Sequence, residues 1–292
     1  MYKNFNDWCR YDGFSEGSGS SEQWWIVNKE TNEIGLFKFP KSPETTDHIS
    51  EKIAADIAKL IGLGCANIDL GIFEDRIGII SYKINDEGVD LIEGINVLNS
   101  KYKNYDSEEL IDVKTGECYS LQMILNSLEE YNLEKDFLKI VIFDFLIGNS
   151  DRHDRNWAIL RKDNVVTLCP VYDNASSLCS YVNENVLEEF FMDHNRLMAL
   201  VDTKSRTLIR IDRFILGKKG PKHSDMIKYI KDNFYEDTID FVEKIKATLT
   251  HSVIEGLIDD YVEYLSPKKV RIIKTYLKSK HKMLLDIYNL KR

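Results

Sequence analysis

Residues 148–173 constrain the fold of this chain more than any other stretch. The preceding segment, 135–147, is apolar nearly all round and therefore predicts a helix buried in a core. Gly148 can end that helix in the left-handed conformation, so the chain turns at once into the polar run NSDRHDRN. Two short apolar runs, 157–160 and 165–169, predict strands that lead on to Asp173. A helix, a polar loop and a strand pair would hold several polar side chains at one place.

Three side chains of this stretch have the chemistry of a phosphoryl-transfer centre. Such a centre needs a carboxylate beside the acceptor hydroxyl and oxygen ligands for Mg²⁺. Asp151 begins the loop after the buried helix, and we expect it to be the base that orients the acceptor. Asn156 and Asp173 are the predicted magnesium ligands. For His153, in the same loop, the sequence leaves two interpretations open: a phosphate contact, or a hydrogen bond that holds the loop.

The other charges of the loop have a simpler interpretation. We expect Asp154 and Arg155 to be solvated, and Arg152 to belong only to the loop that carries the reactive groups. A charged turn between a helix and a strand needs no function, so the short run alone does not establish a site. Its interpretation depends on whether the rest of the chain supplies the opposite wall.

The N-terminal part offers groups for that wall. Residues 13–22 are rich in Gly and Ser, and they precede two apolar runs, 24–27 and 34–39, that predict a β-hairpin. Backbone N–H groups and hydroxyls of such a loop can approach phosphates closely, although Gly and Ser clusters also form plain loops. The candidate nucleotide contacts in the loop are Ser18, Gly19, Ser20 and Ser21.

Lys38 lies in the second strand of this hairpin, among large apolar neighbours. Either it meets an anion there, or it extends to water at a strand edge. The segment 47–61 has apolar residues at helical spacing, and Glu51 lies one turn into it. We predict that Glu51 pairs with Lys38; the alternative is a favourable charge near the helix N-terminus. A second hairpin, 68–84, would bring backbone groups of residues 81–83 to an adenine edge.

Four short motifs, in this order along the chain, resemble those of the HipA-like serine/threonine kinases. They are SGSSE at 18–22, FKFP at 37–40, NSDRHDRNW at 149–157 and PVYD at 170–173. The resemblance implies ATP and Mg²⁺ as cofactors and a two-lobed architecture like that of protein kinases. It also implies specific roles: Asp151 as catalytic base, Asn156 and Asp173 as magnesium ligands, Lys38 on the ATP phosphates and His153 near the nucleotide.

The chain departs from the family pattern in two ways. It begins directly at the kinase-like part, so it resembles the shorter members that lack an additional N-terminal subdomain. A toxin role and an antitoxin-type partner, which the family implies, are therefore weaker expectations. In addition, Asn174 and Ala175 follow Asp173 where many kinases have Phe and Gly, so activation by a flipping Phe is not expected.

These features predict an α+β, bilobal protein-kinase-like fold. The expected parts are an N-terminal nucleotide-binding lobe with a small β-sheet and one helix, an interlobe connection and a mainly helical catalytic lobe, at residues 1–84, 85–118 and 119–292. Helical periodicity recurs at 119–131, 187–200, 226–234, 238–249, 253–265 and from Pro267 onward.

The predicted reaction is transfer of the terminal phosphoryl group of MgATP to Ser or Thr hydroxyls of a protein. Ser18, Ser20 or Ser21 would also be an autophosphorylation site. Two other functions remain open from the sequence: a kinase for a lipid or small-molecule hydroxyl, and a nucleotide-binding module without turnover that acts through partners.

Composition limits the possible partners and location. A net charge of −9 disfavours direct binding to nucleic acid. The chain has no apolar run of membrane-spanning length and no signal peptide, so we expect a cytoplasmic protein with its five scattered cysteines reduced. Residues 268–292 are strongly basic. We expect their lysines on the solvated side of a terminal helix, with an acidic partner surface as the alternative.

Overall fold

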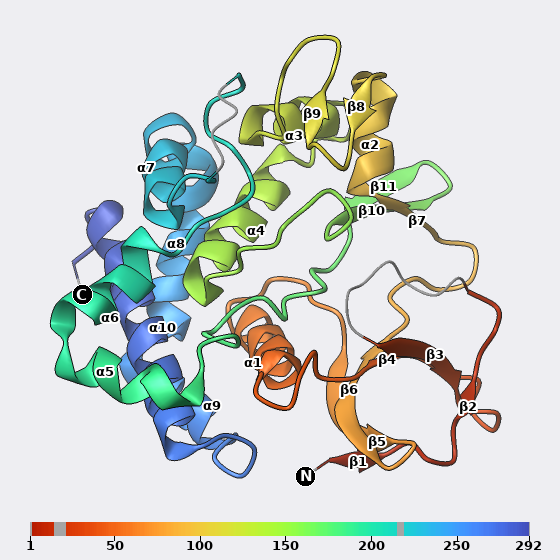
Figure 1. Cartoon of the computed structure of the whole chain (residues 1–292). Coiled ribbons are helices and arrows are strands. Elements are labelled where there is room, and N and C mark those ends of the chain that lie inside the picture. The colour runs from red at the N-terminus through yellow and green to blue at the C-terminus, as the bar shows by residue number, and fades with distance from the viewer. Residues whose placement is uncertain (1, 15–21, 215–218, 292) are drawn as a thin grey trace.

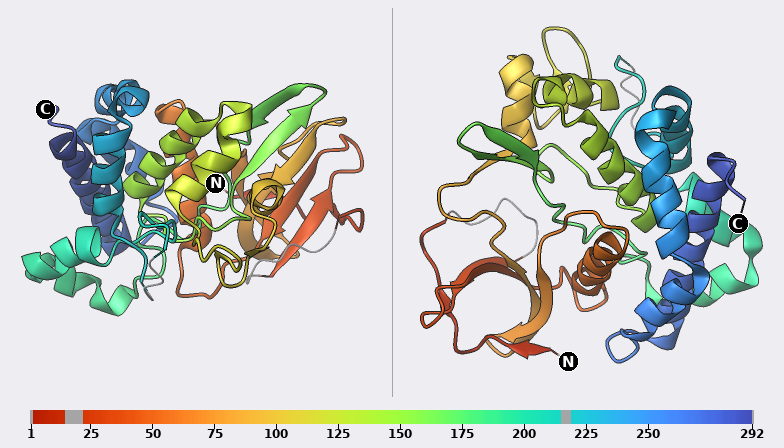
Figure 2. Two further views of the ribbon diagram at one scale, coloured as in Figure 1. Left: turned by 90° about the horizontal axis from the view of Figure 1, so that it is seen from above. Right: turned by 180° about the vertical axis from the view of Figure 1, so that it is seen from behind.

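The computed structural model describes residues 2–14, 22–214 and 219–291. The candidate phosphate contacts Ser18, Gly19, Ser20 and Ser21 lie outside the described residues. A curled β-sheet and a bundle of helices lie on opposite sides of helix α1 (Asp47–Leu60), as Figure 1 and the view from behind in Figure 2 show. The predicted division into a sheet-rich N-terminal part and a helical C-terminal part is therefore present.

The N-terminal sheet holds Lys38 at the end of a central strand. Its six strands have the order β1-β5-β6-β4-β3-β2, and only β1 and β5 pair in parallel. Lys38 is the last residue of β4, opposite Gln23 of β3 and Ile79 of β6. Because side chains alternate along a strand, Phe37 enters the apolar core of the curled sheet while Lys38 faces away from it. The strands are β1 Lys3–Asn4, β2 Cys9–Arg10, β3 Gln23–Val27, β4 Ile34–Lys38, β5 Ile68–Phe73 and β6 Arg76–Tyr82.

Helix α1 covers the other face of this sheet, against β5 and β6. Its isoleucines at 49, 53 and 57 are buried, as the helical spacing predicts. Glu51 is 1% exposed, so a carboxylate is held inside the molecule on the same side of the sheet as Lys38. Since a buried carboxylate without a partner is unfavourable, this position requires a cation.

The C-terminal part is built around α4 (Glu134–Ile147), which packs against α3, α7, α8 and α10. Nearly every residue of α4 from Phe137 onward is buried, as its apolar sequence predicts. The helix ends at Gly148 in the left-handed conformation, with φ 70°. The other long helices are α3 Leu121–Leu128, α7 His223–Asn233, α8 Tyr235–Thr248, α9 His251–Asp259 and α10 Pro267–Ile287.

The predicted helical segment 187–200 is interrupted. It forms α5 (Leu187–Met192) and α6 (His194–Met198), followed by a π-helical turn at Ala199–Thr203. Asp193 has extended backbone angles, and its side chain accepts hydrogen bonds from the N–H groups of Asn195 and Arg196. An Asp in this position starts a new helix, and this explains the break.

A small second sheet attaches the segment 85–118 to the loop after α4. It has the order β11-β10-β7, with β7 (Asp90–Glu93) antiparallel to β10 (Ala158–Lys162). β11 (Val165–Leu168) completes the predicted hairpin. The rest of the segment holds α2 Gly94–Lys101, β8 Tyr105–Asp106 and β9 Ile111–Asp112.

Helix α10 corrects the expectation that the C-terminal lysines all face solvent. Lys269 is 2% exposed and Lys280 is fully buried. The apolar stripe predicted one docking face, but α10 packs against α4, α5, α7, α8 and α9, so more of its circumference is enclosed. Lys274 and Lys278 do lie at the surface side, where they pair with Glu255.

Two further expectations concern cysteines and membranes. All five cysteines are free. Among the described residues, no helix combines the length and apolar character that crossing a membrane requires.

Candidate active site

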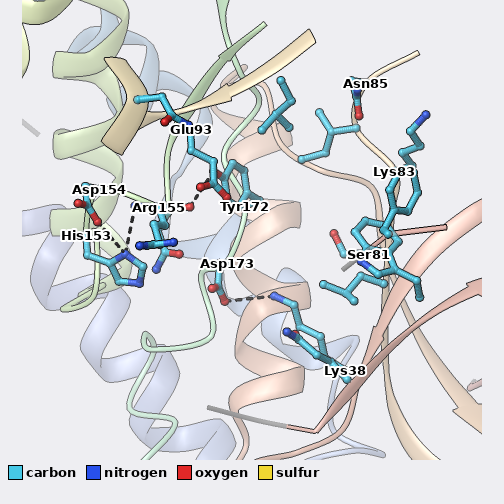
Figure 3. Close-up of a pocket in the computed structure, with 18 of the residues that line it drawn as sticks. Lys38, Ser81, Lys83, Asn85, Glu93, His153, Asp154, Arg155, Tyr172 and Asp173 are labelled. Atoms are coloured by element: carbon cyan, nitrogen blue, oxygen red, sulfur yellow. Dashed lines mark hydrogen bonds and ion pairs between the residues drawn. The ribbon is translucent and has the colours of Figure 1, made fainter. Parts of the chain in front are cut away.

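Lys38, Glu51 and Asp173 meet although they come from three separate parts of the chain. The Nζ atom of Lys38 lies 3.4 Å from Oε1 of Glu51 and 3.2 Å from Oδ1 of Asp173. Figure 3 shows Lys38 and Asp173 pointing toward each other across the cleft. Strand β4, helix α1 and the segment after β11 thus converge on one ammonium group. The predicted pairing of Lys38 with Glu51 is present.

The charges of this cluster follow from burial and proximity. Burial by itself would lower the pKa of Lys38, but Asp173 and Glu51 outweigh it and raise that pKa above its ordinary value. Lys38 in turn lowers the pKa of Asp173. Burial raises the pKa of Glu51, whose Oε2 atom has no hydrogen-bond partner within the described residues. Lys38 is therefore an ammonium group and Asp173 a carboxylate at neutral pH.

The loop that carries Asp151 is set by the end of α4. Gly148 reverses the chain, and the buried Asn149 then fixes the next turn. Its Oδ1 atom accepts a hydrogen bond from the N–H of Asp151 at 3.1 Å, and its Nδ2 donates to Asp144 at 3.2 Å. Partial burial raises the pKa of the Asp151 carboxyl, and the charge of Asp173 adds to this effect. Asp151 is thus held by its backbone while its carboxylate faces a cavity.

Asn156 turns back toward the same loop, as its spacing from Asp151 predicts. Its Nδ2 atom donates to the backbone carbonyl of Asp151 at 2.7 Å. This bond fixes the orientation of the amide and leaves its oxygen as the atom that can bind a cation. Asn156 is buried, whereas the Asp173 side chain is partly exposed.

Arg152 is the site residue that the sequence interpretation missed. It is fully buried and makes a bidentate ion pair with Asp144, with Nε–Oδ2 and Nη2–Oδ1 distances of 2.9 and 2.7 Å. Its remaining hydrogen bonds reach the carbonyls of Asn156 and Tyr172 and the side chain of Asn174. Arg152 therefore ties the loop of Asp151 to the segment of Asp173. A lone Asp in the otherwise apolar end of α4 was the signal that called for a cation.

The expectation that Asp154 is solvated is also wrong. The residue is 1% exposed. Its backbone carbonyl accepts from the N–H of Ile95 at 2.8 Å, so the start of α2 closes over it. Arg155 is exposed, as expected. His153 accepts a hydrogen bond at Nδ1 from the N–H of Arg155, and its ring also borders the cleft (Figure 3), so both of its predicted roles remain compatible with its position.

Two cavities meet at this cluster. The larger, about 1060 Å³, lies between the two lobes and is bordered by Asn156 and by residues 81–85. The smaller, about 300 Å³, is bordered by Asp151. Four residues border both cavities: Gln23, Lys38, His153 and Asp173. A group lying between Lys38 and Asp173 would therefore be reachable from either side.

Hydrogen bonds of the sheet limit which backbone groups of residues 81–83 could contact an adenine edge. The N–H groups of Tyr82 and Lys83 already donate to the carbonyls of Asn67 and Ile34, at 3.0 and 2.9 Å. Strand β6 ends at Tyr82, and the larger cavity continues past it along Lys83, Ile84 and Asn85. An adenine edge would have to use other backbone groups of this segment.

The oxygen atoms present fit a magnesium ion that is shared with a ligand. Magnesium in phosphoryl-transfer sites takes one or two protein oxygens, and phosphates and water supply the rest. Asp173 offers a carboxylate and Asn156 an amide oxygen on the larger cavity. Within the described residues no group of three or more His, Cys, Asp or Glu side chains could hold a metal by itself. The carboxylate of Asp173 and the amide oxygen of Asn156 fit a metal whose other ligands are phosphate and water.

Comparison with known proteins decides the family. Residues 18–237 match the model of the HipA-like C-terminal domain. The chain belongs to the HipA-like C-terminal domain family. The matched range includes all four motifs on which the resemblance rested, and the predicted family is confirmed.

One relative is distant in sequence but similar in fold. Serine/threonine-protein kinase CtkA of Helicobacter pylori strain J99 is 21% identical over 272 residues, which cover 88% of this chain and 78% of CtkA. The crystal structure of a Helicobacter pylori proinflammatory kinase CtkA superposes with a TM-score of 0.82 at 20% identity, over 99% of this chain and 97% of that one. The predicted α+β, kinase-like fold is confirmed.

A second solved structure is more remote. HipA of Shewanella oneidensis MR-1, solved with HipB and its operator DNA, has a TM-score of 0.56 at 15% identity. The match covers 97% of this chain and 69% of that HipA chain.

Proposed function

We propose that this HipA-like protein is a kinase that transfers the terminal phosphoryl group of MgATP to Ser or Thr hydroxyls of a protein. The observation that carries the proposal is the meeting of Lys38, Glu51 and Asp173 where the two cavities join. Asp151 borders one cavity and Asn156 the other, so an acceptor and a nucleotide have separate entrances. The name of the CtkA relative, a serine/threonine-protein kinase, supports the same reaction.

Each residue has one task in this proposal. Lys38, kept charged and oriented by Glu51, binds phosphate oxygens of ATP in the larger cavity. Asp173 and Asn156 hold Mg²⁺, which neutralises charge on the phosphates when it is bound. Asp151 accepts a hydrogen bond from the acceptor hydroxyl in the smaller cavity and orients it for attack.

Autophosphorylation is a further part of the proposal. Ser18, Ser20 and Ser21 immediately precede β3, whose first residue, Gln23, borders both cavities. This short distance along the chain favours one of these serines as the acceptor. Phosphopeptide mapping after incubation with MgATP tests it: phosphate on a peptide containing residues 18–21 supports the proposal, and phosphate only elsewhere contradicts it.

Transfer of label from γ-labelled ATP tests the kinase proposal itself. Wild-type protein should label itself or added protein, whereas Asp151→Asn and Asp173→Asn should each lower transfer by about 100-fold or more. Asp240→Asn, an exposed carboxylate on α8, is the matched control and should leave transfer unchanged. Full transfer by both site variants would contradict the proposal.

The same assay separates the other candidate functions. Label in lipid or small-molecule extracts, and none in protein, would favour a kinase for those hydroxyls. Binding of MgATP without any transfer would favour a nucleotide-binding module. An antitoxin-type partner is a weaker proposal, supported only by the Shewanella HipA relative that was solved with HipB and operator DNA.

A further inference from the structure

The backbone carbonyl of Asn149, two residues before Asp151, has a hydrogen-bond partner outside the loop. His223, at the start of α7, is buried, and its Nε2 atom lies 2.9 Å from that carbonyl oxygen. A carbonyl oxygen only accepts hydrogen bonds, so the proton must be on Nε2 of His223. The tautomer of this histidine is therefore fixed by the backbone that it contacts.

The second nitrogen of the ring continues the chain of hydrogen bonds. Burial lowers the pKa of His223 to about 3, and the charge of Lys280 adds to this effect. The ring is thus neutral at pH 7, and Nδ1 accepts the hydroxyl hydrogen of Ser205 at 3.0 Å. The oxygen of Ser205 then accepts from Lys280 Nζ at 2.8 Å and from the Tyr276 hydroxyl at 3.1 Å. The carbonyl of Asn149 therefore determines which atom donates in each of these hydrogen bonds.

The other end of this hydrogen-bond network reaches Asp151, the proposed catalytic base. Asn149 accepts from the Asp151 N–H through its side chain, so its backbone and its side chain are both engaged. Tyr276 also packs where a side chain on Gly148 would lie, since a Cβ atom there would clash with the hydroxyl oxygen. Residues of both α7 and α10 thus contact the turn at 148–149.

We propose that His223 is a positioning residue for Asp151, and that Ser205, Tyr276 and Lys280 hold its ring in place from the other side. His223 borders neither cavity of the site, so it acts only through the backbone of Asn149. The inference rests on the proposed kinase function, because it assigns His223 a task in that reaction. A loosened Asn149 carbonyl would let the Asp151 carboxylate move relative to the acceptor hydroxyl without disturbing the nucleotide side.

Steady-state kinetics of His223→Leu and His223→Gln test this role. Leu removes the donor, whereas Gln keeps an N–H that can reach the Asn149 carbonyl. We expect His223→Leu to lower kcat by up to about 100-fold, as a misplaced catalytic group does. KM for MgATP should stay unchanged, and His223→Gln should recover most of kcat. Equal kcat for His223→Leu and wild type, or a raised KM with unchanged kcat, would overturn the proposal.

Matched variants separate positioning from a general loss of folding. His281→Leu removes another buried histidine, on α10, whose ring lies against His251 rather than in the network of His223, and it should keep wild-type kcat. Where His223→Leu does not fold at the assay temperature, Ser205→Ala takes its place and should lower kcat in the same direction. A loss of kcat in His281→Leu as large as that in His223→Leu would overturn the positioning role.

Amide hydrogen exchange gives a readout that does not depend on kinase activity. In His223→Leu the peptide that spans 149–157 should exchange faster, while α10 should exchange as in wild type. Unchanged exchange at 149–157 would contradict the inference even if the protein is a kinase. Faster exchange in a protein that transfers no phosphate would leave the structural link intact and contradict the proposed function instead.

Discussion

Two lysines of this protein, Lys38 and Lys280, have opposite surroundings: Lys280 is fully buried, whereas the side chain of Lys38 is 15% exposed. Lys38 lies between two carboxylates at the junction of two cavities, and its pKa is raised. Lys280 lies inside the helical part, 4.4 Å above the ring of Phe145, and its hydrogen bond goes to the hydroxyl of Ser205. Burial lowers the pKa of Lys280 to about 7, because Asp202 compensates only weakly. The two carboxylates beside Lys38 thus keep it charged, whereas burial brings the pKa of Lys280 near neutrality.

The difference distinguishes a lysine that can bind a ligand from one that serves packing. Around Lys38 an orphaned oxygen of Glu51 and an open cavity remain, so the cluster has capacity for another ligand. The neighbours of the Lys280 ammonium group are instead the rings of Phe145 and Tyr276 and the hydroxyl of Ser205, and it borders neither cavity of the site. A lysine of the first kind suits phosphate binding, whereas one of the second kind supports packing and the position of the nearby loop.

The largest effect should follow loss of the Lys38 charge. Lys38→Met should lower phosphoryl transfer by about 100- to 1,000-fold, because it removes a preorganised cation from the phosphates. Circular dichroism at the assay temperature should show a folded protein. Transfer by Lys38→Met within twofold of wild type would place the functional cation elsewhere.

The ion pair between Arg152 and Asp144 should dominate the stability of the loop. Arg152→Met leaves Asp144 buried without its partner and should cost about 3 to 5 kcal/mol in urea unfolding. The double variant Arg152→Met, Asp144→Leu should lose less than Arg152→Met alone, because no buried charge is then left unpaired. A double variant that is less stable than the single one would contradict this interpretation.

The two lysines should also differ in how stability depends on pH. Between its folded pKa of about 7 and its ordinary value of 10.5, Lys280 binds its proton more readily in the unfolded chain. Its contribution to the unfolding free energy should therefore rise with pH in that window, by up to about 1.4 kcal/mol per pH unit. The pKa of Lys38 is raised, so its contribution is fully present below pH 10.5 and is lost only at higher pH.

Urea unfolding of wild type, Lys280→Met and Lys38→Met at pH 7, 8, 9 and 10 measures this contrast. The stability difference between wild type and Lys280→Met should change steadily in favour of wild type. The difference for Lys38→Met should stay constant. Parallel curves for both variants would show that the two lysines titrate alike.

A third lysine should give the smallest effect. Lys269 donates to the backbone carbonyls of Cys179 and Val182, at 3.1 and 2.6 Å, in the segment after Asp173. Lys269→Met should lower the unfolding free energy by about 1 to 2 kcal/mol, because partly buried carbonyls lose a donor. Transfer should fall only a few-fold. A loss of transfer as large as that of Lys38→Met would mean that Lys269 is part of the site.

Sequence patterns predicted the parts of the site that depend on order along the chain. The apolar character of α4, the cap at Gly148 and the helix that carries Glu51 all have local causes, and the structure contains them. The meeting of Lys38 with Asp173 followed from motif order rather than from local pattern. The roles of Asp151, Asn156 and Asp173 remain predictions that the experiments above test.

The burial of charged residues could not be predicted in the same way. Arg152 and Asp154 look like loop charges until Asp144 and the start of α2 are placed beside them. Lys280 looks solvated because its partner Ser205 is 75 positions away along the chain. Such pairs depend on how distant segments pack, which periodicity along a single segment does not encode. The lone Asp144 in the otherwise apolar end of helix α4 was the one local sequence feature that indicated such a pair.

Calorimetric titration of ATP, with Mg²⁺ and with EDTA, tests most directly whether the cluster of Lys38, Glu51 and Asp173 is a magnesium–nucleotide site. Wild type should bind ATP more tightly with Mg²⁺, and Asp173→Asn should lose that dependence while it stays folded. Lys280→Met, whose charge is buried away from the cleft, should keep the dependence of wild type. ATP affinity that is the same with Mg²⁺ and with EDTA, or a full magnesium effect in Asp173→Asn, would contradict the assignment.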